Sequence, residues 1–505
     1  MTISSYGSGA YRAATPNRLV STRADLTDLE RQLATQQRAE TYGDLGTDRL
    51  TSLDLNAKIS TLDSWLEGIT RGNVNLQLSS KAVENYAKLT TETVNDTRSN
   101  TYIPSSTGRS APQVLAEEKF KQTLDLLNTQ VNGRYLFSGK TSDVQPTLGY
   151  TEIIEGDGAG RAGLRQLIDE RRQADLGVAG LGRLTTGGAA ATATIADEAP
   201  AHGYGFKLAG ATSSSAAMTP AFTAGPPANL TVTVASQPAV GDTLRVQLTL
   251  PDGTTEEIVL AARATGTTGQ ASDSFEIGVD VNATATNLRA SITAALGKEA
   301  ATTLSAASSQ VAARNFFAGT ASSPPLRVPG PPYNTATAAP AAGTPANTVI
   351  WYRGDDGSDP ARSTASVQVD KGQIVGTGAR ANEEAFRIGL AQFAIMAVET
   401  FPANDANSQS RYEAMTARVS DRLAFGNGAQ KPAEIITEFG SAQTALARAK
   451  ERHESTKNYL GTTLSSVETV SREEVAVQIL SLQTQLQASY ETTSILSKLT
   501  LTNYL

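Results

Sequence analysis

Large apolar residues recur at heptad spacing in the N-terminal part of the chain and predict long helices there. Residues 17–132 contain almost no proline. The heptad d positions are Leu55, Leu62, Ile69, Leu76, Val83 and Thr90, and the a positions are Ile59, Leu66, Asn73, Ser80, Ala87 and Val94. A shorter run at Leu19, Leu26, Leu29 and Leu33 precedes the loop YGDLGTD, and a later one falls at Phe120, Leu124, Leu127 and Val131. These patterns predict helical segments interrupted at YGDLGTD.

The same periodicity returns at the C-terminal end. A 3-4 alternation runs through Phe439, Ala442, Leu446, Ala449, His453, Thr456, Leu460, Thr463, Val467 and Val470. The phase slips near Glu474 and resumes one position along at Val475, Ile479, Leu482, Leu486, Ser489, Thr493 and Leu496. Such a slip lets a helix change the face it presents. We expect one or two long helices after Pro432, preceded by two short amphipathic helices over residues 381–401 and 411–425. The apolar stripe of the first is Phe386, Leu390 and Phe393, and that of the second is Tyr412, Met415, Val419 and Leu423.

The middle of the chain, residues 143–350, is rich in Ala, Gly, Thr, Ser and Pro and has alternating apolar and polar positions. TLRVQLTLPDGTTEEIVLAARA predicts a β-hairpin that turns at Pro251, Asp252 and Gly253. LTVTV (230–234) and SFEIGVDV (274–281) predict further strands, and residues 283–300 predict a helix. Residues 187–203, 223–229 and 330–347 are expected to be loops because small residues and proline dominate them.

Two ends that share one periodicity, around a middle of different composition, are most simply folded by pairing the ends and inserting the middle. The predicted fold class is therefore α+β: a long antiparallel coiled-coil or helical bundle formed by the N- and C-terminal segments, with a β-rich inserted middle domain. We expect residues 1–45 and 460–505 to form terminal helices and residues 46–180 and 349–459 to form a helical rod domain with small β-hairpins. Residues 181–348 would form a β-rich, surface-exposed variable insertion.

Composition narrows the functional classes. The 505 residues carry a net charge of −7 with a pI near 5.2, which argues against a nucleic acid or an anionic membrane as partner. The absence of cysteine excludes disulfides, thiolate metal sites and cysteine nucleophiles. The start MTISSYGSGAYRAATP has no basic segment followed by an apolar one, so we expect no cleavable Sec signal peptide. No apolar run is long enough to span a bilayer.

Three motifs suggest chemistry, and each has a simpler explanation. Gly158, Gly160 and Gly163 spell G-x-G-x-x-G between the strand-like YTEIIE and the helical LRQLIDERR, but no βαβ unit follows, which favours a flexible turn over a dinucleotide site. GDDGSDP (354–360) lacks the Glu that closes a calcium loop and is expected to be a turn. His202 and His453 are far apart in sequence, and His453 is expected to pack in a helix seam. We predict a protein that is not an enzyme, with no catalytic, metal or cofactor site.

Several segments resemble the bacterial flagellin family. NGRYLFSGKTSD (132–143) is similar to the place in this family where a helix gives way to the first β-hairpin, and QLATQQRAETYGDLG (32–46) is similar to the loop region after the first helix. WYRGDDG (351–357), ARANEEAFR (379–387) and the ending LTLTNYL are closest to the branch that joins hook to filament. The resemblance covers about residues 1–180 and 349–505, and the start SSYGSGAYRAATPNRLV fits neither branch closely.

The resemblance implies a structural component of the flagellum: a hook–filament junction adaptor or, as the alternative, the filament flagellin itself. It implies that the paired terminal helices line a tube, with the helical rod outside them. It also implies export through the flagellar type III apparatus, an export chaperone that holds the C-terminal helix, an extracellular location, and axial partners that include self, a second junction protein and flagellin. A more distant alternative is a secreted adhesin or glycan-binding protein that acts through the insertion.

The ending SILSKLTLTNYL (494–505) is unusually apolar for a terminus. Without a core of its own, such a helix predicts that neighbouring subunits bury it, at roughly 25 cal/mol per Å² of apolar surface. The expected assembly contacts are Leu19, Leu26, Leu29, Leu33, Leu482, Leu486, Ile495, Leu496, Leu499, Leu501, Tyr504 and Leu505. Pairing within one chain would cover part of the same surface.

Overall fold

The computed structural model describes residues 8–99, 101–103, 107–426 and 428–502, with side chains described between residues 18 and 495. The fold is α+β, as predicted. It divides into two compact units. Unit 1 is drawn from residues 1–71, 368–374 and 444–505, and unit 2 from residues 72–367 and 375–443.

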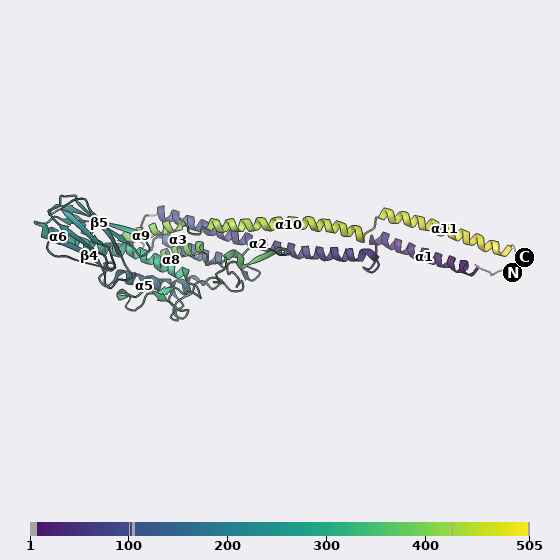
Figure 1. Cartoon of the computed structure of the whole chain (residues 1–505), viewed down its shortest axis with the longest axis horizontal. Coiled ribbons are helices and arrows are strands. Elements are labelled where there is room, and N and C mark those ends of the chain that lie inside the picture. The colour runs from purple at the N-terminus through teal and green to yellow at the C-terminus, as the bar shows by residue number, and fades with distance from the viewer. Residues whose placement is uncertain (1–7, 100, 104–106, 427, 503–505) are drawn as a thin grey trace. The chain divides into compact units, whose positions relative to one another are not determined.

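Unit 1 contains the terminal helices and the adjoining ends of two long helices. Helix α1 (Ser8–Thr35) packs on α11 (Arg472–Thr502), as Figure 1 shows. The first part of α2 (Arg49–Ser99), preceded by the short helix η1 (Gly46–Asp48), contacts the last part of α10 (Pro432–Glu468). There Lys457 Nζ lies 2.5 Å from Asp63 Oδ1, and the ring of Trp65 packs 5.2 Å from that of His453. His453 is buried, which confirms its expected packing role.

The heptad prediction for α2 is correct for one set of positions and shifted for the other. Every predicted d position, from Leu55 to Thr90, is buried. The predicted a positions are half-buried, and in unit 2 the buried partners lie one residue earlier, at Gly72, Ser79, Tyr86 and Thr93. The buried positions are shifted because α2 packs against Val367 and α8 in unit 2. A Cβ on Gly72 would lie 2.3 Å from Val367 Cγ2, and Tyr86 donates its hydroxyl hydrogen bond to the carbonyl of Ala385.

Unit 2 has a helical layer centred on α8. The elements of this layer are α3 (Ala111–Leu127), α4 (Tyr150–Glu155), α5 (Leu164–Leu176), α7 (Ser305–Ala318), α8 (Glu384–Val398) and α9 (Ser408–Leu423). α8 is enclosed by α3, α7 and α9, and its side chains are buried almost all round. The sequence predicted an amphipathic helix here, and Phe386, Leu390 and Phe393 are buried as expected. Arg387 and Ile388 are among the residues of α8 that keep partial exposure.

Two four-stranded sheets and one helix share a core in unit 2. One sheet has the order β3 (Leu184–Gly187), β4 (Thr192–Asp197), β7 (Asn229–Val234), β6 (Met218–Thr223) and is antiparallel. The other has the order β10 (Ser274–Glu276), β9 (Thr255–Arg263), β8 (Thr243–Thr249), β5 (Lys207–Ser213), with β10 parallel to β9. Helix α6 (Val281–Glu299) packs on both, and a π-helical turn, η2 (Ala300–Leu304), joins it to α7. Ile195, Val232, Val246, Leu260 and Leu288 lie in the common core.

Most predicted β elements are confirmed, and two segments were assigned wrongly. The β8–β9 hairpin turns at residues 250–254, as expected, and LTVTV lies in β7. Of the predicted strand SFEIGVDV, only Ser274–Glu276 forms a strand, β10. The predicted loop 187–203 contains β4, the central partner of both β3 and β7. Its small residues fit there because alternate side chains of β4 point into a crowded core. YTEIIE, read as strand-like, is helix α4, and Ile153 and Ile154 are both buried on it.

Short two-stranded ladders lie in the connections between helices. They are β1 (Gln130–Val131) with β2 (Arg134–Tyr135), β11 (Leu326–Arg327) with β12 (Ala341–Ala342), and β13 (Ser366–Asp370) with β14 (Gln373–Gly376). Single-turn helices η3 (Tyr333–Thr335) and η4 (Ala361–Thr364) occur in the connections. The ladder β1–β2 follows α3 directly, at the segment NGRYLFSGKTSD.

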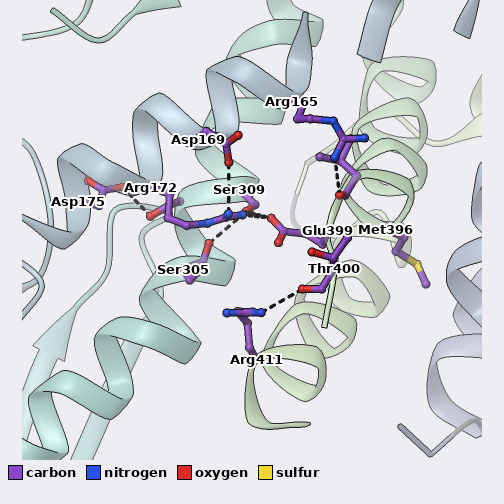
Figure 2. A network of polar contacts seen from close by, with 12 residues as sticks. Arg165, Asp169, Arg172, Asp175, Ser305, Ser309, Met396, Glu399, Thr400 and Arg411 are labelled. Atoms are coloured by element: carbon purple, nitrogen blue, oxygen red, sulfur yellow. Dashed lines mark hydrogen bonds and ion pairs between the residues drawn. The ribbon is translucent and has the colours of Figure 1, made fainter. Parts of the chain in front are cut away.

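A polar network closes the C-terminal end of α8 and ties it to the helices on either side of the inserted sheets (Figure 2). Glu399 forms an ion pair with Arg172 of α5 and accepts a 2.6 Å hydrogen bond from Ser309 Oγ of α7. Donors from other elements meet the carbonyls that the helix end leaves free. These are Gln113 Nε2 to Met396 O (3.0 Å) and Glu399 O (2.7 Å), Arg165 Nη1 to Val398 O (3.0 Å), and Arg411 Nη2 to Thr400 O (3.0 Å).

The two compact units have boundaries that differ from those of the three predicted segments. Residues 305–318 were expected in a surface insertion, yet α7 packs against α5, α8 and α9, with Phe316 and Phe317 buried. The sheets and the helical layer therefore belong to one compact unit. Small side chains on α7 allow this close helix packing, and composition alone gave no sign of it.

Candidate assembly surface

The residues predicted to mediate assembly lie on α1 and α11 of unit 1, and the structure places them in different environments. On α1, Leu19, Leu26, Leu29 and Leu33 are half-buried. On α11, Leu482 is half-buried, Leu486 is 8% exposed and Ile495 is 56% exposed. The side chains of Leu496, Leu499 and Leu501, together with Tyr504 and Leu505, lie outside the described residues. Packing of α1 on α11 within one chain thus covers part of the expected contact set and leaves Ile495 open.

Helix α11 carries large apolar side chains on a second side that packing within unit 1 leaves uncovered. Val477 is 66% exposed and Leu480 is 63% exposed, and both lie on the side of Ile495. At 3.6 residues per turn the three side chains fall within about 60° of one another. Val475, Ile479 and Leu486 are buried and lie on the opposite side of the helix. We call Val477, Leu480 and Ile495 the outer stripe.

Other large apolar side chains of unit 1 are also exposed. Val20 lies on α1, beside the half-buried Leu19, and Leu50 lies in the first turn of α2. Tyr459 is exposed on α10. Single exposed apolar residues are common on soluble proteins, whereas several on one small group of helices indicate a contact surface.

Both helix pairs of unit 1 break at the same level, where α1 leads to the loop before α2 and α10 leads to α11. The amide of Arg38 donates to the carbonyl of Glu468 (2.8 Å), and the amide of Val470 donates to the carbonyl of Gln36 (3.2 Å). Gln37 and Thr469 form an antiparallel bridge. The predicted phase slip near Glu474 therefore corresponds to a helix break at residues 469–471.

The side chain of Glu468 fastens this junction to α2. It accepts hydrogen bonds from the hydroxyl of the buried Ser52 and, at 3.3 Å, from Asn56 Nδ2. A carboxylate acceptor makes these bonds stronger than neutral ones. The junction holds together two segments that are more than 400 positions apart in sequence.

Replacing Glu468 by alanine is expected to loosen the junction by about 1–3 kcal/mol, because the buried hydroxyl of Ser52 loses its charged acceptor. Hydrogen exchange measures this directly: the amides of Arg38 and Val470 should exchange roughly 10-fold faster or more. Glu454→Ala is the matched control, since Glu454 lies on the same helix in an exposed pair with Lys450. Equal exchange in both variants would contradict the fastening role.

The sequence motifs that suggested other chemistry are local turns. Asp157 Oδ1 accepts from the amides of Ala159 (3.0 Å) and Arg161 (2.9 Å), so its own side chain fills the glycine loop. Hydrogen bonds from Arg161 lower the pKa of Asp157 to about 2. A Cβ on Gly163 would lie 2.4 Å from the amide nitrogen of Gly156. Gly163 thus serves close chain packing, whereas Gly158 and Gly160 have positive φ angles of 69° and 111° in the loop. The turn prediction is confirmed.

The three carboxylates of GDDGSDP each interact with a different partner. Asp355 Oδ1 accepts from the amide of Gly357 (3.2 Å), Asp356 Oδ2 accepts from the amide of Ser322 (3.0 Å), and Asp359 pairs with Lys140. Across residues 8–99, 101–103, 107–426 and 428–502, no group of His, Cys, Asp and Glu side chains is arranged to hold a metal ion. None of the helices in that same part of the chain is both long and apolar enough to cross a bilayer.

Three segments that carry the flagellin resemblance contact one another in unit 2. The amide of Gly139 donates to Ala379 O (3.1 Å), the amide of Ala381 donates to Phe137 O (2.8 Å), and the amide of Asp355 donates to Ser138 O (2.9 Å). The rings of Phe137 and Phe386 pack edge to face, 5.7 Å apart. Residues 132–143, 351–357 and 379–387 therefore form one local structure.

A comparison of the chain with models of protein families and with curated proteins found no match.

Sequence reasoning missed Val477 and Leu480, which the heptad reading assigned to the outside of the helix. The sequence signal that could have identified them is that both are large apolar residues at solvent-facing positions. Solvent-facing positions of a helix pair usually carry polar side chains, and here they carry a valine and a leucine that recur with Ile495 on one side.

Proposed function

We propose that this chain is a structural subunit that assembles with copies or relatives of itself through its paired terminal helices. The observation that carries this proposal is the outer stripe of α11. One apolar face of the helix packs within unit 1, and the opposite face presents Val477, Leu480 and Ile495 to solvent. Large apolar side chains on both sides of a helix favour a second neighbour, and unit 1 supplies one.

We further propose that the assembly is the bacterial flagellum, and that the chain is the adaptor of the hook-associated protein 3 type, which joins hook to filament. The resemblance of residues 132–143, 351–357, 379–387 and the ending LTLTNYL supports this choice. The first three of these segments lie together in unit 2, as expected if they descend from one ancestral structural element. The position of the β1–β2 ladder after α3 fits the same resemblance.

The finer architecture belongs to this proposal. The terminal segments would form an antiparallel coiled-coil pair that lines the inner tube, with the rest of the chain outside it. The axial partners would be further copies, a second junction protein and flagellin, after export through the type III apparatus with a chaperone. Filament flagellin is the alternative, because the family resemblance covers both branches.

Locating the protein on flagella of the source bacterium tests the proposal. An epitope inserted at residues 266–270, an exposed turn after β9, should label one band at the hook–filament junction in electron micrographs. Label along the whole filament would replace the junction role by the filament role. Flagella without label, from cells that express the tagged protein and swim, would refute both.

A further inference from the structure

A cavity of about 820 Å³ opens in unit 2 among α5, α7, α8 and the end of α9. Its apolar wall comes from Leu167 of α5, Val311 of α7, and Ile388 and Ala391 of α8. Pockets that hold small organic ligands have this range of volume and a mainly apolar lining with a few polar groups. The cavity lies wholly within unit 2, away from the outer stripe and from the residues that carry the proposed function.

The polar lining includes a pair of amides that fix each other. Gln310 Nε2 donates to Gln392 Oε1 at 2.7 Å, and Gln392 Nε2 donates to Gln310 Oε1 at 3.0 Å. Both side chains are buried. Each amide keeps a second N–H, so the pair can still donate to an oxygen atom in the cavity.

Arg387 is a half-buried arginine of the cavity lining whose guanidinium makes no ion pair in the described part of the chain. Within the described part of the chain, no hydrogen bond or ion pair reaches its guanidinium, and its Nε is buried without a partner. Burial lowers the pKa of Arg387 below its usual value, and the charge of Glu384 opposes that shift. Other arginines with a buried, unpaired Nε, such as Arg172 and Arg411, place their remaining nitrogens on acceptors. A half-buried guanidinium without an acceptor is costly.

The carboxylates that line the cavity do not accept hydrogen bonds from Arg387. Glu170 pairs with Arg327 and accepts from the Tyr333 hydroxyl. Asp252 pairs with Arg418 at 3.1 Å. Glu384 accepts from the amide of Gln430 at 3.1 Å, and Asp421 is exposed at the rim.

We propose that this cavity binds an organic monoanion with an apolar body, whose carboxylate pairs with Arg387 while its hydrocarbon part lies on Leu167, Val311 and Ala391. The planar guanidinium fork matches a carboxylate in two parallel hydrogen bonds. Arg314, which also lines the cavity and is exposed, adds positive charge at its mouth. This inference is independent of the proposed function, because it uses no residue of the assembly surface.

Titration calorimetry of the purified full-length chain with decanoate tests the proposal. We expect saturable binding with one site per chain, and clearly weaker binding of the uncharged 1-decanol. Arg387→Met should reduce the affinity for decanoate roughly 10- to 100-fold, the usual effect of losing a charged hydrogen-bond partner. Arg387→Lys should fall between the two.

Two further variants separate the site from general surface binding. Arg245→Met removes an exposed arginine on β8, paired with Glu257, and should leave the affinity unchanged. Ala391→Phe fills the cavity and should abolish binding; Val311→Trp serves the same purpose if the first variant does not fold, as judged by circular dichroism. Absence of saturable decanoate binding, or equal affinities of the wild-type and Arg387→Met proteins, would overturn the proposal.

Discussion

Replacing Val477 and Leu480 together by glutamate is expected to abolish assembly and to leave the monomer folded. Both side chains are exposed on α11, opposite the residues that pack within unit 1, so the substitution leaves the buried Val475, Ile479 and Leu486 in place. In an assembly the same positions would be buried. Each copy would lose the transfer free energy of two apolar side chains and would have to desolvate two carboxylates.

The expected loss of association free energy can be estimated from the burial of the two apolar side chains alone. Burial of a valine or leucine side chain stabilises by about 1.5–3 kcal/mol, so the pair contributes about 3–6 kcal/mol per contact. At 1.4 kcal/mol per factor of 10, the association constant should fall by at least roughly 100-fold. Sedimentation of the purified protein under conditions in which the wild type assembles measures the change. Under the flagellar proposal, loss of swimming in cells that carry the variant is expected as well.

The control variant adds the same charge to another side of α11. Gln478→Glu with Gln485→Glu also adds two carboxylates to exposed positions of α11, off the outer stripe. Assembly of this control protein together with loss of assembly in the stripe variant would locate the contact. If both variants assemble as well as the wild type, α11 makes no subunit contact through this face.

The helical part of the fold could be predicted because packing imposes a period on the sequence. The d positions of α2 and the stripes of α8 and α9 identified buried residues correctly. The predicted a positions failed in unit 2 because a heptad assumes one partner along the whole helix. There α2 meets Val367 and α8, and the buried positions moved to Gly72 and Tyr86.

The missed elements were those whose residues owe their burial to distant neighbours. The strand β4 has the sequence TATIAD, in which Ile195 is the one large apolar residue, and its place between β3 and β7 decides its conformation. On α7, Ser305, Ser308 and Ser309 are buried, although serine usually marks a surface. Their burial depends on partners such as Asp175 and Glu399, which no local pattern connects to them.

The site predictions divide in the same way. Leucines of α1 and α11 could be chosen because their spacing marks a helix seam. The outer stripe and Arg387 could not, because each is defined by what the fold leaves uncovered or unpaired. An exposed valine and a half-buried, unpaired arginine cannot be told from other valines and arginines in the sequence, because only the three-dimensional context distinguishes them.

Removing the carboxylate of Glu399 is expected to cost unit 2 about 2–4 kcal/mol of its free energy of unfolding. Glu399 is buried and holds Arg172, whose side chain keeps partial exposure and a second acceptor, Asp169, at 3.4 Å. Breaking a buried pair by removing one partner typically costs about 3–5 kcal/mol, and the remaining acceptor lowers the expected loss by about 1 kcal/mol. Urea unfolding followed by the fluorescence of the buried Trp351, in a Trp65→Phe background, reports on unit 2.

A double-mutant cycle distinguishes the pair from simple loss of packing. Glu399→Leu leaves the Arg172 guanidinium short of its main acceptor, whereas Glu399→Leu with Arg172→Met removes both charges and keeps apolar volume at the end of α8. The double variant should therefore be more stable than Glu399→Leu alone, with a coupling of about 1–3 kcal/mol. Glu413→Ala, at an exposed position of α9, should change the stability by less than about 0.5 kcal/mol. Additive effects of the two network substitutions would contradict this coupling, because the charges in Figure 2 would then contribute independently of each other.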